Sequence, residues 1–249
     1  MTDLTDPADP AGRKAELAAN LARVEERISA ACSAAGRKRE DVTLIVVTKT
    51  YPADDVRLLH ELGVRQVAEN RDQDAAPKAA ECADLTGLRW HFVGQLQTNK
   101  VRSVVTYSDL VQSVDRDRLV TALSAAAVKA EREVGCLIQV ALDAESGARG
   151  DRGGVAPDGI EQLARLVADA PGLRLDGLMT VAPLTGAYAG RERAAFERLM
   201  DLSTDLRRAH PAANMVSAGM SGDLEEAVAA GATHVRVGTA VLGVRPRLG

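Results

Sequence analysis

Residues 42–52 have the sequence VTLIVVTKTYP, and this stretch decides the fold. Val42–Thr48 is an unbroken apolar and β-branched run, which is typical of a strand buried on both faces of a parallel sheet. Pro52 begins a helical pattern that ends at Gly63, so a helix follows the strand directly. Lys49 therefore stands at the carboxyl end of a buried strand, where α/β barrels and open α/β sheets keep their chemistry.

The same alternation of strand and helix patterns continues along the chain. The expected strands are Val42–Thr48, Val64–Glu69, Leu88–Val93, Asp109–Val114, Cys136–Leu142, Leu173–Met179, Asn214–Ser217 and His234–Val237. A helix is expected after each of the first seven, most clearly at Asp115–Glu133, Asp158–Ala170, Arg191–Ala209 and Ser221–Ala230. Eight βα units in about 210 residues predict an α/β fold, the TIM (β/α)8 barrel. A doubly wound open sheet is the alternative, because the number of units does not prove closure.

The segment before the first strand contains a lead and an additional helix. Residues 1–11 are acidic and contain proline, and we expect this lead to be disordered. Apolar residues then recur at spacings of three and four, which predicts an N-terminal amphipathic helix that ends near Gly36 and buries Leu17, Leu21, Val24, Ile28 and Cys32. No linker or shift in composition divides the rest, so residues 12–249 are expected to form a single domain.

The composition argues against several classes of function. A net charge of −4 over 249 residues lacks the basic surface typical of nucleic-acid binding. No stretch approaches the roughly 18 apolar residues that span a bilayer, and the N-terminus does not resemble a signal peptide. Cys32, Cys82 and Cys136 are expected to be free, mostly buried thiols in a reducing cytoplasm, neither disulfide-bonded nor metal ligands. Nothing in the sequence requires more than a monomer.

Polar residues follow most of the expected strands, and in a barrel they would converge on one mouth. A primary amine such as Lys49, held against apolar walls, loses hydration, which lowers its pKa and lets it form a Schiff base. A solvated lysine at a strand end is the alternative. Asn70 follows the second strand and is included among the expected ligand-binding residues, with loop polarity or helix capping as the alternative role. His91, inside the third strand, is expected to be packed in the barrel.

Two glycine-containing turns follow the last two strands. Ser217–Asp223 has the sequence SAGMSGD, and Arg236–Thr239 has the sequence RVGT. Glycines let backbone N–H groups approach an anion, and TIM barrels often hold a phosphate at the loops after strands seven and eight. Tight packing alone would also explain one such turn. The two together predict a phosphate site formed by Ser217, Gly219, Ser221, Gly238 and Thr239.

An amine after strand one and a phosphate site after strands seven and eight suit a ligand that carries both an aldehyde and a phosphate. Pyridoxal 5′-phosphate (PLP) is such a ligand, and Arg236 would face its ring nitrogen. A guanidinium there keeps the nitrogen unprotonated, which weakens the electron-sink behaviour of the cofactor. The alternative for Arg236 is an ion pair inside the barrel with a carboxylate on a neighbouring strand.

These residues stand in motifs that resemble the YggS/PROSC family of pyridoxal phosphate homeostasis proteins. The resemblance extends from about Val42 to Gly243, and the motifs that carry it are VTKT at 47–50, EN at 69–70, WHFVGQLQTNK at 90–100, GLM at 177–179, SAGMS at 217–221 and VRVGTAVLG at 235–243. It implies a barrel similar to the N-terminal domain of alanine racemase, PLP bound as a Schiff base on Lys49, phosphate contacts from the last two turns, and a role in PLP supply, possible recipients being PLP-dependent apo-enzymes.

The sequence departs from the family pattern at a few positions. Ala68 stands where glycine is common, Tyr51 stands where lysine is common, and Arg152 with the two following glycines replaces a Lys-x-Gly motif in the long loop Asp143–Pro157. This chain therefore has no lysine at that place in the loop. Arg149 and Arg152 could instead form a transient anion site, although a solvated loop is the simpler interpretation.

The family resemblance favours a PLP carrier and regulator over an enzyme. Racemisation needs acid–base groups on both faces of the substrate, and only Lys49 is an evident candidate, with His91 a weaker second. In alanine racemase the second group comes from a further β domain and a partner subunit, and we expect no such domain after the eighth strand here. Two alternatives stay open: a Schiff-base barrel enzyme, such as a racemase-like protein or a phosphosugar aldolase, and a scaffold that binds no PLP.

Overall fold

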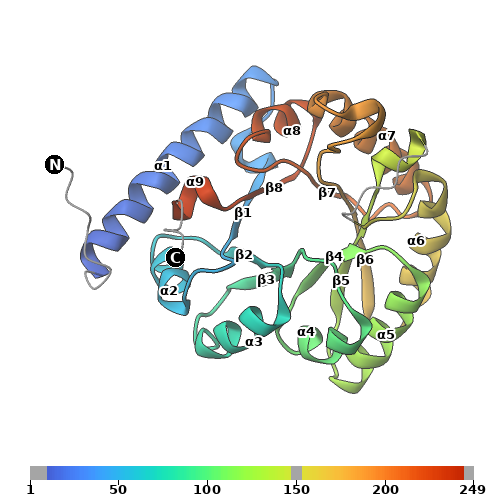
Figure 1. The fold of residues 1–249 in the computed structure, drawn as a ribbon, viewed down its shortest axis with the longest axis horizontal. Coiled ribbons are helices and arrows are strands. Elements are labelled where there is room, and N and C mark those ends of the chain that lie inside the picture. Colours follow the sequence, from blue (N-terminus) through green and yellow to red (C-terminus); the bar gives the residue numbers. More distant parts are fainter. Residues whose placement is uncertain (1–9, 147–152, 244–249) are drawn as a thin grey trace.

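The structure is a computed structural model that describes residues 10–146 and 153–243. At its centre is a closed barrel of eight parallel strands in chain order (Figure 1). The strands are β1 (Thr43–Val47), β2 (Gln66–Glu69), β3 (Arg89–Phe92), β4 (Leu110–Val114), β5 (Val134–Gln139), β6 (Leu173–Met179), β7 (Met215–Ser217) and β8 (His234–Val237). Pairing of β1 with β8, from Thr43 opposite His234 onward, closes the barrel. The predicted TIM barrel is confirmed, and the open sheet is excluded.

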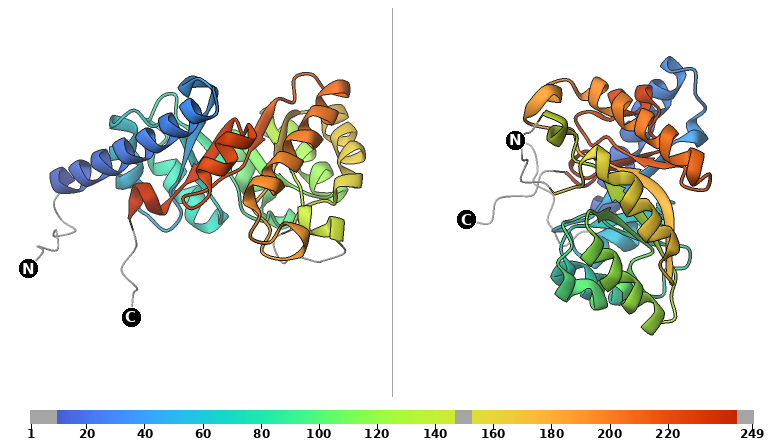
Figure 2. Two further views of the ribbon diagram at one scale, coloured as in Figure 1. Left: turned by 90° about the horizontal axis from the view of Figure 1, so that it is seen from above. Right: turned by 90° about the vertical axis from the view of Figure 1, so that its right-hand side faces the viewer.

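Helices follow the strands and cover the outside of the barrel, as Figures 1 and 2 show. They are α2 (Ala53–Glu61), α3 (Asp72–Glu81), α4 (Val101–Tyr107), α5 (Asp117–Lys129), α6 (Ile160–Asp169), α7 (Glu192–Ala209), α8 (Leu224–Ala230) and α9 (Thr239–Leu242). The helix expected after each of the first seven strands is present, and the short α9 after β8 was not predicted.

The additional N-terminal helix is α1 (Pro10–Ala34), which packs against α8 and α9 (Figure 2). Proline is favoured at a first helical position, and α1 begins at Pro10, inside the lead that we expected to be disordered. Residues 1–9 of that lead lie outside the described residues. The buried face of α1 includes the five predicted residues, among them Leu17 and Ile28, which are fully buried.

Most predicted boundaries lie within two residues of the observed ones, and three elements differ by three residues or more at one end. The fifth strand spans Val134–Gln139 instead of Cys136–Leu142, because its pairing with β6 already begins at Val134 opposite Leu173. Leu142 is apolar because it is buried in a 3₁₀ turn, outside the sheet. α8 begins three residues later than expected because residues 221–223 form a turn, and α5 ends four residues early, close to Glu131 with its positive φ of 50°.

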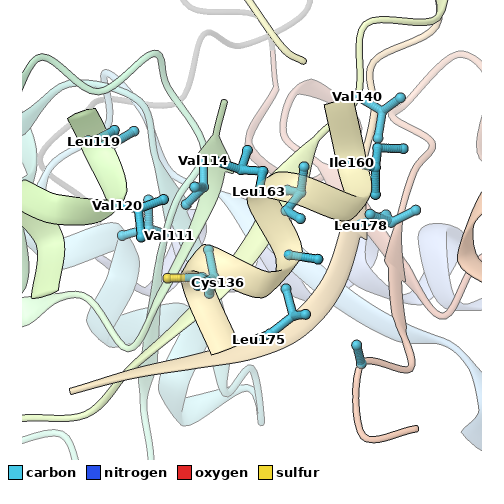
Figure 3. Close-up of a cluster of buried hydrophobic side chains, with 14 of the residues drawn as sticks. Val111, Val114, Leu119, Val120, Cys136, Val140, Ile160, Leu163, Leu175 and Leu178 are labelled. Carbon is cyan, nitrogen blue, oxygen red and sulfur yellow. The ribbon is translucent and has the colours of Figure 1, made fainter. Parts of the chain in front are cut away.

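The hydrophobic core lies mainly between the outer face of the barrel and the helices. Figure 3 shows part of it, a cluster of buried side chains that includes Val111 and Val114 of β4, Leu163 of α6 and Leu178 of β6. All three cysteines are free and buried, as predicted. Among the described residues, no helix combines the length and the apolar character that a membrane span requires.

Candidate functional site

The ends of β1, β7 and β8 enclose a cavity of about 380 Å³, a size typical of small-molecule sites. Its lining comes from three segments distant in sequence: Val47, Lys49, Thr50, Tyr51, Met220, Ser221, Gly222, Arg236, Gly238, Thr239 and Gly243. Five of the predicted site residues are therefore brought together in one place, namely Lys49, Ser221, Arg236, Gly238 and Thr239.

Lys49 occupies a tight turn directly after β1. The N–H of Tyr51 donates to the carbonyl of Thr48 at 3.1 Å, and Thr50 adopts a φ of 70°, a left-handed conformation that is unfavourable for a β-branched side chain. Lys49 is exposed, and its ammonium makes no hydrogen bond or ion pair with the described residues. The expectation that apolar walls enclose the amine is therefore wrong, because the turn carries Lys49 past the end of the strand to the open side of the cavity.

Arg236, on β8, is held very differently. Its side chain is buried, with Nη1 donating to Ser217 Oγ at 2.6 Å and Nη2 donating to the carbonyl of Thr180 at 2.9 Å. Within the described part of the chain it has no carboxylate partner, so the alternative of a barrel-interior ion pair is not met. Burial lowers the pKa of Arg236 to about 10, which still leaves the guanidinium charged at neutral pH. The cavity therefore contains a fixed positive charge that has no ion-pair partner among the described residues.

Backbone amides supply further donors on the same side. Within residues 10–146 and 153–243, the N–H groups of Ser221, Gly222, Gly238 and Thr239 have no hydrogen-bond acceptor, although all four residues line the cavity. Gly219 shapes the first turn: it has a φ of 87°, and a Cβ there would lie 2.5 Å from the Cβ of Ala227. Four unpaired amides beside a guanidinium form a site for an anion.

The other predicted site residues do not line the cavity. Ser217 is fully buried beneath it and contacts Arg236, while the carbonyl of Gly219 accepts the N–H of Arg236 at 2.9 Å. Asn70 is half-buried at the end of β2, where its backbone packs so closely on Gly94 that a Cβ at Gly94 would lie 2.0 Å from the Asn70 carbonyl oxygen. Arg149 and Arg152 lie outside the described residues.

A hydrogen-bonded chain that we did not predict from the sequence connects Arg236 to the far side of the barrel. Because the guanidinium can only donate, Ser217 Oγ accepts from it and donates to Gln112 Oε1 at 2.7 Å. Gln112 Nε2 then donates to His91 Nδ1 at 2.8 Å, and His91 Nε2 donates to Gln66 Oε1 at 2.7 Å. Burial lowers the pKa of His91 to about 3, so this histidine is a neutral interior group, as expected.

Comparison with known proteins agrees with this geometry. Residues 19–246 match the family model described as the alanine racemase N-terminal domain. The chain is 40% identical over 248 residues to the pyridoxal phosphate homeostasis protein of Mycobacterium tuberculosis strain H37Rv, which covers 94% of both chains. It is 41% identical over 229 residues to the protein of the same name from Pseudomonas aeruginosa, which covers 92% of this chain and 96% of the relative.

A solved structure shows the same fold with a ligand. PipY of Synechococcus elongatus PCC7942, a COG0325 family member with PLP bound, is similar at 33% identity with a TM-score of 0.74, covering 88% of this chain and 100% of PipY. The chain belongs to the family of pyridoxal phosphate homeostasis proteins, and its barrel is that of the alanine racemase N-terminal domain.

Proposed function

We propose that this protein binds PLP in the cavity between β1, β7 and β8, with a Schiff base to Lys49, and that it serves as a PLP carrier in PLP homeostasis. One observation carries the proposal: an amine, a buried guanidinium and four unpaired amides from three distant segments line the same cavity. The PLP-bound structure of PipY and the names of the curated relatives support the choice of ligand.

The residues fit the chemical groups of this cofactor. PLP supplies an aldehyde that condenses with a primary amine, an anionic phosphate and a pyridine nitrogen. Lys49 offers the amine, and the amides of Ser221, Gly222, Gly238 and Thr239 offer donors to the phosphate. Arg236, which stays protonated at neutral pH, would donate to the ring nitrogen and so keep that nitrogen unprotonated.

Two features favour a carrier over an enzyme. His91, considered above as a second acid–base group, has both ring nitrogens engaged inside the barrel and does not line the cavity. The exposure of Lys49 leaves the amine open to exchange with small molecules or with a recipient protein. We infer that PLP-dependent apo-enzymes receive the cofactor from this site.

The proposed Schiff base is tested with Lys49→Ala. PLP added to the wild-type protein should give a visible absorbance, and borohydride reduction followed by mass spectrometry should locate the adduct on Lys49. The variant should lose both signals while keeping its melting temperature, because Lys49 is exposed. Lys129→Ala, a change at an exposed lysine in the last turn of α5, is the matched control. An adduct that persists in Lys49→Ala would contradict the assignment.

The carrier role needs a separate experiment. PLP-loaded protein is mixed with a PLP-dependent apo-enzyme, in the presence of a scavenger that consumes free PLP. Reactivation that survives the scavenger supports direct delivery. Reactivation that the scavenger abolishes shows that PLP is first released to solution. Turnover of an amino acid by the loaded protein alone would favour the Schiff-base enzyme instead.

A further inference from the structure

The Glu69-Asn70 motif contains a buried charge that the cavity does not use. Glu69, the last residue of β2, is fully buried, and Lys78 of α3 donates to its Oε1 from Nζ at 2.5 Å. The exposed fractions of the two side chains are only 1% and 7%. Such a buried pair contributes little to stability, because the loss of hydration offsets the attraction between the charges. The role of the ion pair is therefore better explained by the groups to which it is hydrogen-bonded.

The pair holds the residue that precedes Lys49. Lys78 Nζ also donates to the carbonyl of Thr48 at 2.9 Å, and Thr48 Oγ1 donates to Glu69 Oε1 at 2.7 Å. Thr48 is itself fully buried. Both its carbonyl and its hydroxyl are thus fixed by one ion pair, at the point where the chain leaves β1.

The same carbonyl closes the turn that presents Lys49. It accepts the N–H of Tyr51 as well as the ammonium of Lys78, so the turn and the ion pair share one acceptor. Thr50 lies inside this turn and has a φ of 70°. A threonine keeps this conformation only where its surroundings enforce it. Relaxation of Thr50 to a negative φ would redirect the adjacent Lys49.

An unfavourable feature of Glu69 also indicates a functional role. Its second oxygen, Oε2, is buried and has no hydrogen-bond partner in the part of the chain that the structure describes. An unpaired buried carboxylate oxygen is unfavourable for folding. Costs of this kind concentrate where a protein maintains a functional geometry.

We propose that Glu69 and Lys78 are positioning residues that hold the strained turn at Thr48–Tyr51 and so aim the Lys49 amine into the cavity. Neither residue lines the cavity. The inference rests on the proposed function, since it concerns how Lys49 meets the aldehyde of PLP.

The test separates adduct formation from ligand binding. Glu69→Leu/Lys78→Met removes both charges without leaving one unpaired. The rate of adduct formation is followed by visible absorbance with PLP, and the dissociation constant is measured with pyridoxine 5′-phosphate, whose alcohol cannot form a Schiff base. Misorientation of a reacting group slows a reaction strongly, so we expect a rate loss of about tenfold or more. The dissociation constant should stay within about twofold, because the phosphate and ring contacts are untouched.

Two further variants exclude a merely structural effect. Lys14→Met makes the same lysine-to-methionine change in an exposed ion pair with Glu61 and should leave the rate unchanged. Thr50→Gly, added to the double variant, relieves the strain because glycine adopts positive φ freely, and it should restore most of the adduct rate. If the double variant does not fold, Thr48→Val is measured in the same two assays and should show the same separation to a smaller degree. This change removes the hydroxyl bond to Glu69 and a longer one, of 3.5 Å, to the carbonyl of Ala68.

The proposal is overturned if rate and affinity fall together, if the rate does not change, or if Thr50→Gly restores nothing. Failure of the proposed function would look different. In that case the wild-type protein would form no adduct, or Lys49→Ala would retain it.

Discussion

Lys49 and Arg236 line the same cavity, yet the structure holds them in opposite ways. Arg236 is buried, its guanidinium donates to Ser217 and to the backbone of Thr180, and a hydrogen-bonded chain extends from it across the barrel. Lys49 is exposed, and its ammonium has no partner among the described residues. On its side of the cavity the backbone is fixed and strained while the amine stays free.

The difference suits two requirements of the carrier that we propose. The β7–β8 side offers preorganised donors, which would bind a phosphate and a ring nitrogen without having to rearrange. The β1 side offers an accessible amine, which would form and release a covalent bond with successive partners. On this proposal the fixed donors provide affinity, and the accessible amine provides exchange.

The largest expected effect comes from Arg236, on the β7–β8 side of the cavity, which we call the fixed side. With pyridoxine 5′-phosphate as ligand, Arg236→Met should weaken binding by about 30-fold or more, because a hydrogen bond from a charged donor contributes about 2 kcal/mol. Lys49→Ala should change the same dissociation constant by less than about twofold, since this ligand offers no aldehyde. Isothermal titration calorimetry measures both. Equal losses in the two variants would erase the distinction between the sides.

A smaller effect should appear in the pH dependence of stability. The pKa of His91 is lowered to about 3 in the folded state by burial, whereas the unfolded chain takes up this proton near pH 6.5. The contribution of His91 to the free energy of unfolding is therefore fully present above about pH 6.5 and is lost as the pH falls toward 3. Between pH 7 and pH 5 we expect His91 alone to reduce the free energy of unfolding by about 2 kcal/mol.

Urea unfolding at the two pH values measures this loss. In His91→Gln, which keeps a neutral hydrogen-bonding side chain, the difference between pH 7 and pH 5 should shrink by the same amount. Nuclear magnetic resonance of the His91 ring should show no titration above pH 5. If His91 instead titrates with a midpoint near pH 6.5 in the folded protein, the hydrogen-bonded chain from Arg236 ends at Ser217 and does not include His91.

The parts of this site that follow from the sequence are those encoded locally. An apolar run ending in Lys49 places the amine at a strand end, and the glycines at 219 and 238 indicate turns with accessible amides. Strand and helix patterns are local in the same sense, because they depend on neighbouring residues. Their alternation therefore predicts the barrel. The exposure of Lys49 depends on the turn at Thr50, whose positive φ no residue pattern indicates.

The missed residues depend on contacts between distant segments. Gln112 lies in β4, all five residues of which are buried, and only the closed barrel brings it to Ser217, 105 residues away. Lys78 has the pattern of an ordinary helix lysine, and its role arises from Thr48, 30 residues earlier. A single sequence contains no signal for either contact, because both require the register of the finished barrel.

The smallest expected effect belongs to the Lys49 side. Tyr51 donates its hydroxyl to the carbonyl of Gly243 at 2.8 Å, and its ring lies 5.6 Å from the guanidinium carbon of Arg13. Tyr51→Phe removes the hydrogen bond and keeps the ring contact, so the free energy of unfolding should fall by about 1 kcal/mol. Affinity for pyridoxine 5′-phosphate should not change, because we assign the phosphate and ring contacts to the β7–β8 side. A loss of affinity like that of Arg236→Met would show that the β1 side also binds the ligand through fixed contacts. The distinction between the β1 side and the β7–β8 side would then be wrong.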